Sequence, residues 1–133
     1  MRRTVNDKKR MVIAFRKYSR LGLSSPDLDA FSAYRRIRGC SSNLEDAYEL
    51  ASVYDTLRFL RLSGETESID ALFAVYFCGA DKPLRKNDVS YRVQRFAIEH
   101  SCDARTVYRR LARVYGVYSV ILSDHRRARR GDR

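Results

Sequence analysis

Apolar residues recur every three or four positions along most of the chain, which is the spacing of amphipathic α-helices rather than of strands. Glycine, proline and small polar side chains interrupt this pattern and predict where helices begin and end. We therefore predict an all-α protein, a compact bundle of about six helices. The predicted helices are about 6–21, one capped by Ser25 and ended by Gly39, one capped by Ser42 and ended by Gly64, about 66–78, about 88–100, and one from Asp103 to about 122.

Local signals refine these boundaries. Pro26 suits the first turn after a Ser25 cap, and Ser42 with Glu45 three residues later forms a candidate capping box. Asn87 follows the one clear loop, "GADKPLRK", and is the expected cap of the fifth helix. Each helix has an inward stripe; three of these stripes are Leu28, Phe31, Tyr34 and Ile37, then Leu44, Tyr48, Ala51, Tyr54, Leu57 and Leu60, then Val107, Leu111, Val114, Tyr118 and Ile121.

The pattern divides the chain into three parts. Residues 1–64 form an N-terminal helical region, residues 65–123 form a helix-turn-helix unit, and residues 124–133 form a basic tail that we expect to be flexible. Apolar residues make up 44% of the 133 residues, which is enough for one packed core.

Charge is unevenly distributed along the chain. Residues 1–20 carry eight Lys/Arg and one acid, residues 21–81 carry five against ten, and residues 82–133 carry fourteen against five. Two basic ends therefore flank an acidic middle, with a formal net charge of +11. This asymmetry favours a polyanionic partner, most often nucleic acid. The basic ends themselves have two open interpretations: arms that clamp a nucleic-acid backbone, or termini that keep the protein in solution.

Several classes of protein are not indicated. The three cysteines are widely spaced and fit small buried groups in a reducing compartment, so we expect a cytoplasmic protein without structural metal. The longest apolar run, 71–80, is shorter than the roughly twenty residues of a membrane span. His100 and His125 have no carboxylate and nucleophile at useful spacing, so we predict no catalytic residues, no cofactor and no enzyme activity.

The last two helices have the spacing of a helix-turn-helix, because only about three residues separate them. Ala97 is small where the two helices must approach each other closely. Cys102 is apolar and placed in the turn, from which its side chain would pack into the core. Asp103 is a good N-cap for the sixth helix. The turn "HSCD" has no glycine, so His100 or Ser101 must adopt a left-handed or bridging conformation.

A basic face remains once the buried stripe of the sixth helix is removed. Arg105, Thr106, Arg109 and Arg110 are predicted to read bases in the major groove, where guanidinium groups bond guanine or phosphate bidentately. Four further side chains are predicted to hold phosphates: Arg113, Arg92, Arg95 and Lys86. A solvated helix side is the alternative interpretation, but no acid occurs between Arg105 and Tyr118.

The segment "AIEHSCDARTVYRRLARV" resembles the C-terminal helix-turn-helix of sigma factors and related regulators. "ALFAVYFCG" resembles the helix that precedes it, and the match covers about 66–118. A small basic chain with such an ending is similar to bacteriophage late-gene transcription regulators, of the ArpU/RinA type or the small Q-type antiterminators. The resemblance implies binding to double-stranded DNA and action on RNA polymerase or late promoters.

Our main hypothesis is a sequence-specific DNA-binding transcription regulator, a phage or prophage late-gene activator or antiterminator. The acidic middle would face RNA polymerase or a second copy of the chain. The alternative is a DNA-packaging protein of the small-terminase kind or another nucleic-acid-binding assembly protein, and duplex RNA is a third possible target. Tyr91 and Tyr108 could stack on bases, although a boundary position of the core is the preferred interpretation.

Overall fold

The computed structural model describes residues 5–23 and 29–130 and is helical over most of them. Within these ranges it contains six α-helices and no strand, which confirms the prediction of an all-α fold. A π-helical turn, Phe73–Phe77, continues the fourth helix. The helices are α1 (Val5–Arg20), α2 (Ala30–Cys40), α3 (Leu44–Leu62), α4 (Thr66–Leu72), α5 (Asp88–Glu99) and α6 (Ala104–Arg130).

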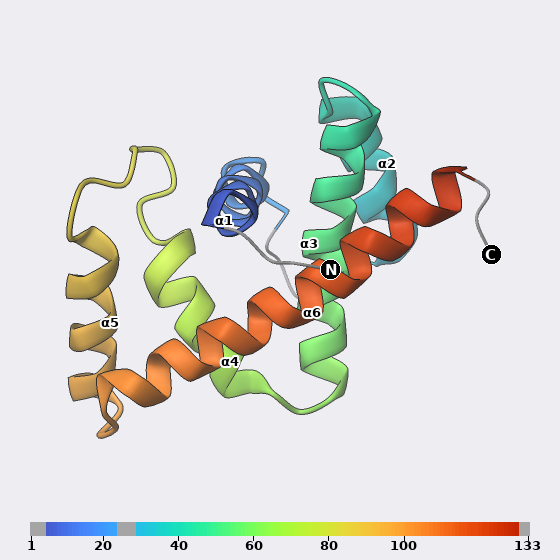
Figure 1. Cartoon of the computed structure of the whole chain (residues 1–133). Coiled ribbons are helices and arrows are strands. Elements are labelled where there is room, and N and C mark those ends of the chain that lie inside the picture. Colours follow the sequence, from blue (N-terminus) through green and yellow to red (C-terminus); the bar gives the residue numbers. More distant parts are fainter. Residues whose placement is uncertain (1–4, 24–28, 131–133) are drawn as a thin grey trace.

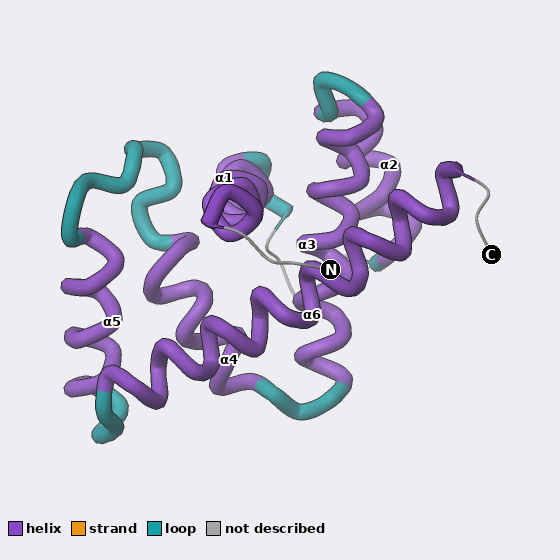
Figure 2. Tube along the Cα trace, viewed as in Figure 1, coloured by secondary structure: helices purple, strands orange, loops and turns teal. Residues whose placement is uncertain are grey.

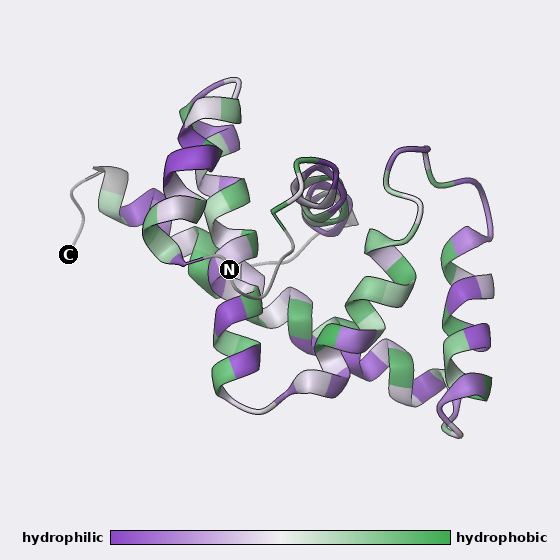
Figure 3. Cartoon of the chain, turned by 180° about the vertical axis from the view of Figure 1, so that it is seen from behind, coloured by the Kyte–Doolittle hydropathy of each residue, from purple (hydrophilic) through white to green (hydrophobic). Residues whose placement is uncertain are grey.

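Helix α6 organises the molecule. It runs from α5 at one side to the α2–α3 hairpin at the other, and α1 lies between these two ends (Figure 1). Along its length α6 packs against α5, α4, α1 and α3 in turn. Most connections are short, and the longest described loop leads from the π-helical turn to α5 (Figure 2). Hydrophobic and hydrophilic bands alternate along α6, as expected for a helix that is buried on one side only (Figure 3).

Aromatic side chains from three segments meet in the centre of the core. The ring of Phe15 in α1 contacts Tyr118 of α6 edge to face, with centroids 5.4 Å apart, and lies 6.1 Å from Phe77 of the π-helical turn. Tyr18 lies 6.5 Å from the same Phe77 ring. Residues more than 100 positions apart therefore share one core, and the N-terminal region and the α5–α6 region are not packed separately.

Two helices end in a left-handed glycine, as the sequence predicts. Gly22 after α1 has φ +71° and Gly64 after α3 has φ +75°. In both cases the next N–H bonds back to a carbonyl five residues earlier, which is the Schellman arrangement. These bonds run from Leu23 to Tyr18 (3.4 Å) and from Glu65 to Leu60 (2.8 Å).

Several predicted helix starts are wrong by one or more residues. Asp29 caps α2 by accepting a hydrogen bond from the backbone N–H of Ser32 (2.8 Å), and the predicted cap Ser25 lies outside the described residues. Asn43, not Ser42, caps α3 by accepting from the N–H of Asp46 (2.8 Å). Asn87 occupies the cap position of α5 with φ +73°, but its side chain makes no capping bond.

The predicted inward stripe of α2 is wrong in part: Ile37 is buried as predicted, Phe31 and Tyr34 are not, and Leu28 lies outside the described residues. Phe31 is 76% exposed and Tyr34 is 36% exposed, whereas Ala33 and Ile37 are the side chains that α2 buries. Helical spacing shows which residues share a face, but α2 has only α3 to cover it, so a second apolar face remains in solvent. Leu44, at the start of α3, is likewise 50% exposed.

Two further expectations are corrected. Cys40 and Cys78, predicted to be buried, are exposed, and only Cys102 is partly buried. Helix α6 does not end near residue 122 but continues to Arg130, so residues 124–130 of the predicted flexible tail are helical. No helix in the described part of the chain has the length and apolar character needed to cross a membrane.

Candidate nucleic-acid interface

The turn between α5 and α6 is closed without glycine. Ser101 adopts the left-handed conformation with φ +53°, as the sequence requires of it or of His100. The N–H of Ser101 donates to the carbonyl oxygen of Ile98 (3.3 Å), and the N–H of Cys102 donates to the carbonyl oxygen of Ala97 (2.9 Å). These are the two bonds of a Schellman ending, and Cys102 packs against the core. The predicted turn, with Cys102 as its apolar plug, is therefore present.

Asp103 fixes the first turn of α6. Its Oδ1 accepts a hydrogen bond from the backbone N–H of Thr106 at 2.8 Å. This bond, the Thr106 hydroxyl and the charges of Arg105 and Arg109 keep the pKa of Asp103 below its ordinary value. Beneath this capped turn the predicted stripe of α6 is buried, with Val107 and Val114 fully enclosed. Thr106, predicted to face DNA, is half-buried beside the cap.

Arg105 and Arg109 lie on the outer side of α6. Both are exposed, and neither forms an ion pair or hydrogen bond with any side chain in the described ranges. Ala112, one turn further, is also exposed. The arginine side chains are thus free to contact a surface laid against the first three turns of α6.

Arg110 and Arg113 are arranged differently, because α4 supplies carboxylates beside them. Nη2 of Arg110 lies 3.4 Å from Oε2 of Glu67. Arg113 is held bidentately by Glu65, with its Nε at 2.9 Å and its Nη2 at 3.1 Å from the two carboxylate oxygens. The guanidinium of Arg113 also lies 5.8 Å from the ring centre of Phe59. The structure therefore divides the predicted basic face into an unpaired and a paired half.

The three predicted phosphate-binding residues near α5 have different environments. Nη1 of Arg92 donates to the main-chain oxygens of Val75 (2.8 Å) and Cys78 (2.9 Å), so this guanidinium closes the end of the π-helical turn. Arg95 is exposed and lies 3.5 Å from Glu99 one turn later on α5. Lys86 is exposed in the loop before α5.

Tyr91 and Tyr108 do not occupy boundary positions of the core. Tyr91 is 67% exposed on α5, and Tyr108 is 45% exposed next to Arg109 on α6. The preferred interpretation of these two tyrosines was therefore wrong. Ile98, 80% exposed at the end of α5, adds an apolar side chain near the turn.

The far half of α6 carries a polar cluster that sequence reasoning missed. Nε2 of His125 lies 2.8 Å from Oδ2 of Asp55, whose other oxygen accepts a hydrogen bond from the hydroxyl of Tyr34. The His125 ring stacks on Tyr48 with centroids 6.2 Å apart. The sequence spacing around His125 therefore did not reveal Asp55, which lies 70 residues earlier in the chain. This cluster joins α6 to α2 and α3, and no nucleophilic serine or cysteine hydrogen-bonds to these groups in the described structure.

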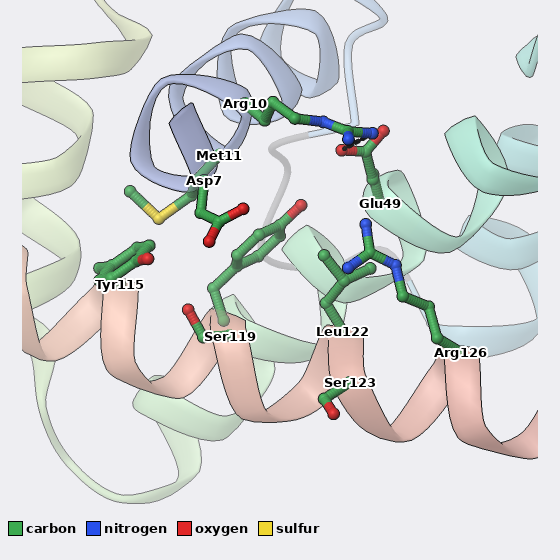
Figure 4. A pocket seen from close by; sticks show the side chains of 10 residues that line it. Asp7, Arg10, Met11, Glu49, Tyr115, Ser119, Leu122, Ser123 and Arg126 are labelled. Carbon is green, nitrogen blue, oxygen red and sulfur yellow. Dashed lines mark ion pairs between the residues drawn. The ribbon is translucent and has the colours of Figure 1, made fainter. Parts of the chain in front are cut away.

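A small cavity opens between α1 and α6 (Figure 4). Its volume is about 210 Å³, and its lining includes Arg10 and Glu49, whose ion pair measures 3.4 Å. Burial raises the pKa of Glu49 although Arg10 and Arg126 lie nearby. The buried hydroxyl of Tyr118, which also lines the cavity, has no hydrogen-bond partner among the described residues. No group of three or more His, Cys, Asp or Glu side chains in the described ranges is placed to hold a metal.

The carboxylates of α4 are the residues near this interface that the sequence did not reveal. Glu65 and Glu67 lie 48 and 43 positions before their arginine partners, and no local pattern connects such positions. The only available signal is that Gly64 ends a helix and places the following acids at a fixed corner. Comparison of the chain with protein-family models, with curated proteins and with solved structures gives no match.

Proposed function

We propose that this protein is a sequence-specific DNA-binding transcription regulator that places the first turns of α6 in the major groove. Arg105 and Arg109 would contact base edges, and Arg95 and Lys86 would contact phosphates. A phage or prophage late-gene activator or antiterminator, the class that the sequence resembles, is the proposed biological setting. The assignment of Arg92 is revised: its hydrogen bonds to Val75 and Cys78 favour a role in holding the fold.

One observation carries this proposal. Arg105 and Arg109 lie one turn apart, exposed and unpaired within the described chain, on a helix whose start is fixed by the Asp103 cap and whose opposite side is buried. Unpaired arginines on a rigid helix retain their full capacity to bond bases and phosphates bidentately. A merely solvated side would not require the tight, strained turn at Ser101 that sets the angle of α6.

Exposed apolar side chains on α2 and at the end of α3 support a protein partner. Phe31 on α2 is 76% exposed and Leu62 at the end of α3 is 78% exposed, and exposed apolar side chains of this size are candidates for an interface. RNA polymerase or a second copy of the chain would meet this surface. Light scattering separates the alternatives, because a closed high-order ring favours DNA packaging, whereas a monomer or dimer favours regulation.

The experiment that tests the proposal is a selection of random-sequence duplexes with the purified protein, followed by affinity measurements on the enriched sequence. We expect one motif to be enriched and the double variant Arg105→Ala/Arg109→Ala to lose it, with affinity falling about tenfold or more. The matched control is Arg35→Ala/Arg38→Ala, which removes the same charge from exposed positions on the distant α2.

Both double variants should keep the helical content and thermal midpoint of the natural chain, because all four arginines are exposed. If the natural chain enriches no sequence, recognition of a specific operator is wrong. If the two double variants lose affinity equally, the contact is a general charge effect and α6 is not the reading helix.

A further inference from the structure

The fold sets the backbone positions of the two glutamates that form ion pairs with α6. Glu65 follows the left-handed Gly64, and its N–H is bonded to Leu60 at 2.8 Å. Its position at the start of α4 is therefore set by the ending of α3. Glu67 lies in the first turn of the same short helix, and Ile69 and Leu72 anchor α4 in the core. The backbone of both glutamates is thus held beside one edge of α6.

These carboxylates occupy the groups that would otherwise bind phosphate. A guanidinium bonded through Nε and Nη2 to one carboxylate, as Arg113 is to Glu65, cannot offer that edge to phosphate at the same time. The hydrogen bonds and charge of this pair lower the pKa of Glu65 and raise that of Arg113, so both groups are charged near neutral pH. Arg110, whose side chain is only 25% exposed, points toward Glu67 instead of away from the helix.

A nucleic acid lying on the outer side of α6 would meet an asymmetric surface. At one edge it finds Arg105 and Arg109 unpaired, and at the other it finds two arginines accompanied by two fixed negative charges. Exposed ion pairs of this kind are weak, so phosphate oxygens can replace the carboxylates. The carboxylates nevertheless repel phosphate and compete with it at every encounter.

We propose that Glu65 and Glu67 restrain nucleic-acid binding by holding Arg113 and Arg110 in ion pairs, which must open before the paired nitrogens of these arginines can contact phosphate. This inference rests on the proposed function, because it concerns the same side of α6. The restraint limits non-specific attraction by a chain of charge +11 and leaves recognition to Arg105 and Arg109. Its release adds two phosphate contacts.

The test compares the double variant Glu65→Gln/Glu67→Gln with the natural chain on random-sequence double-stranded DNA and on the duplex from the selection. Glutamine keeps the size and hydrogen-bonding capacity of the side chain and removes its charge. We expect affinity for random-sequence DNA to rise roughly fivefold or more, and the slope of log affinity against log salt to steepen by up to about 1.8, which is two phosphate contacts.

A matched control separates the ion pairs from a general change of charge. Asp70→Asn/Asp124→Asn removes the same two charges from exposed positions that do not pair with Arg110 or Arg113. Adding Arg110→Ala/Arg113→Ala to the Glu65→Gln/Glu67→Gln variant should then abolish the gain in affinity. Thermal unfolding of each variant establishes that the fold is retained.

Each outcome has a distinct meaning. The restraint is supported if the glutamine variant gains more affinity for DNA than the control variant and if this gain requires Arg110 and Arg113. It is also supported if the glutamine variant binds DNA and the natural chain does not. A gain equal to that of the control, or one that persists without the arginines, overturns the restraint and leaves the proposed function standing. Absence of binding by the natural chain and by the glutamine variant overturns both.

Discussion

Nη1 of Arg16 lies 2.9 Å from the main-chain oxygen of Tyr76, 60 residues further along the chain. The same guanidinium donates to the oxygens of Gly79, at 2.9 Å, and Lys82. Its side chain belongs to a residue that is only 5% exposed, and burial, followed by the charges of Arg92 and Arg20, lowers its pKa. A buried cation from α1 therefore bonds one carbonyl group of the π-helical turn and two of the loop that follows it.

Replacing this cation should destabilise the fold. Arg16→Met keeps an apolar stem but leaves three carbonyl oxygens without their donor, so we expect a loss of about 2–4 kcal/mol in the free energy of unfolding. Urea denaturation measures the change. Arg20→Met is the matched control, because Arg20 is exposed and makes one 3.2 Å bond to Ala80. Equal losses in the two variants would contradict the special role of Arg16.

Arg92 should affect stability rather than nucleic-acid contacts. Its Nη1 bonds the carbonyls of Val75 and Cys78, so Arg92→Met should lower the free energy of unfolding by roughly 1–2 kcal/mol. The salt dependence of DNA binding should stay unchanged. Lys86→Ala should do the reverse, reducing the salt slope by about one phosphate contact while leaving stability unaltered. A reduced salt slope in Arg92→Met would restore its original assignment to phosphate.

More of the fold than of the candidate site could be predicted from the sequence, for a physical reason. Helical periodicity follows from local spacing, so the buried stripe of α6 was evident, with Val107 and Val114 fully enclosed as predicted. Whether a face is covered depends on the packing of other helices, and the spacing of Phe31 could not show that its side chain stays largely in solvent.

The same limit applies to charges. A run of arginines is visible in the sequence, but its partners are set by the tertiary fold. Arg105 and Arg113 look alike along α6, yet only Arg113 meets a carboxylate, from Glu65 at the start of another helix. The turn was easier to predict than the ion pairs, because Ser101 lies between the end of α5 and the Asp103 cap and few backbone conformations can join them.

The C-terminal part of α6 should contribute to stability, although its composition suggests a solvated tail. Arg126 is bonded to Glu45 and His125 to Asp55, so truncation after Leu122 removes both contacts. We expect the thermal midpoint to fall by roughly 3–6 °C. Truncation after Ala128 keeps these contacts and serves as the control. A tail that only frays would give the same midpoint in both truncated chains.

The left-handed residue in the α5–α6 turn should accept glycine with a gain in stability. Ser101 has φ +53°, a region that strains side chains other than glycine, so Ser101→Gly should raise the free energy of unfolding by about 0.5–1 kcal/mol. Ser63, with φ −83° at the end of α3, is the control. There the unfolded chain gains freedom and no strain is relieved, so Ser63→Gly should lower stability. Chemical denaturation at one pH distinguishes the expected gain in the free energy of unfolding from the expected loss.

The Asp103 cap should make the stability of the α5–α6 region depend on pH. Because the hydrogen bond from Thr106 lowers the pKa of Asp103 in the folded state, its stabilising contribution is present above the ordinary pKa and is lost as pH falls through the lowered value. Asp103→Asn keeps a capping oxygen without a titrating group, and Asp103→Ala removes the cap. The natural chain should exceed Asp103→Asn in thermal midpoint near neutral pH, and the difference should shrink below about pH 4. The Ala variant should be the least stable of the three at neutral pH.

A difference between the natural chain and the Asn variant that does not change with pH would mean that the carboxylate charge contributes nothing to the cap.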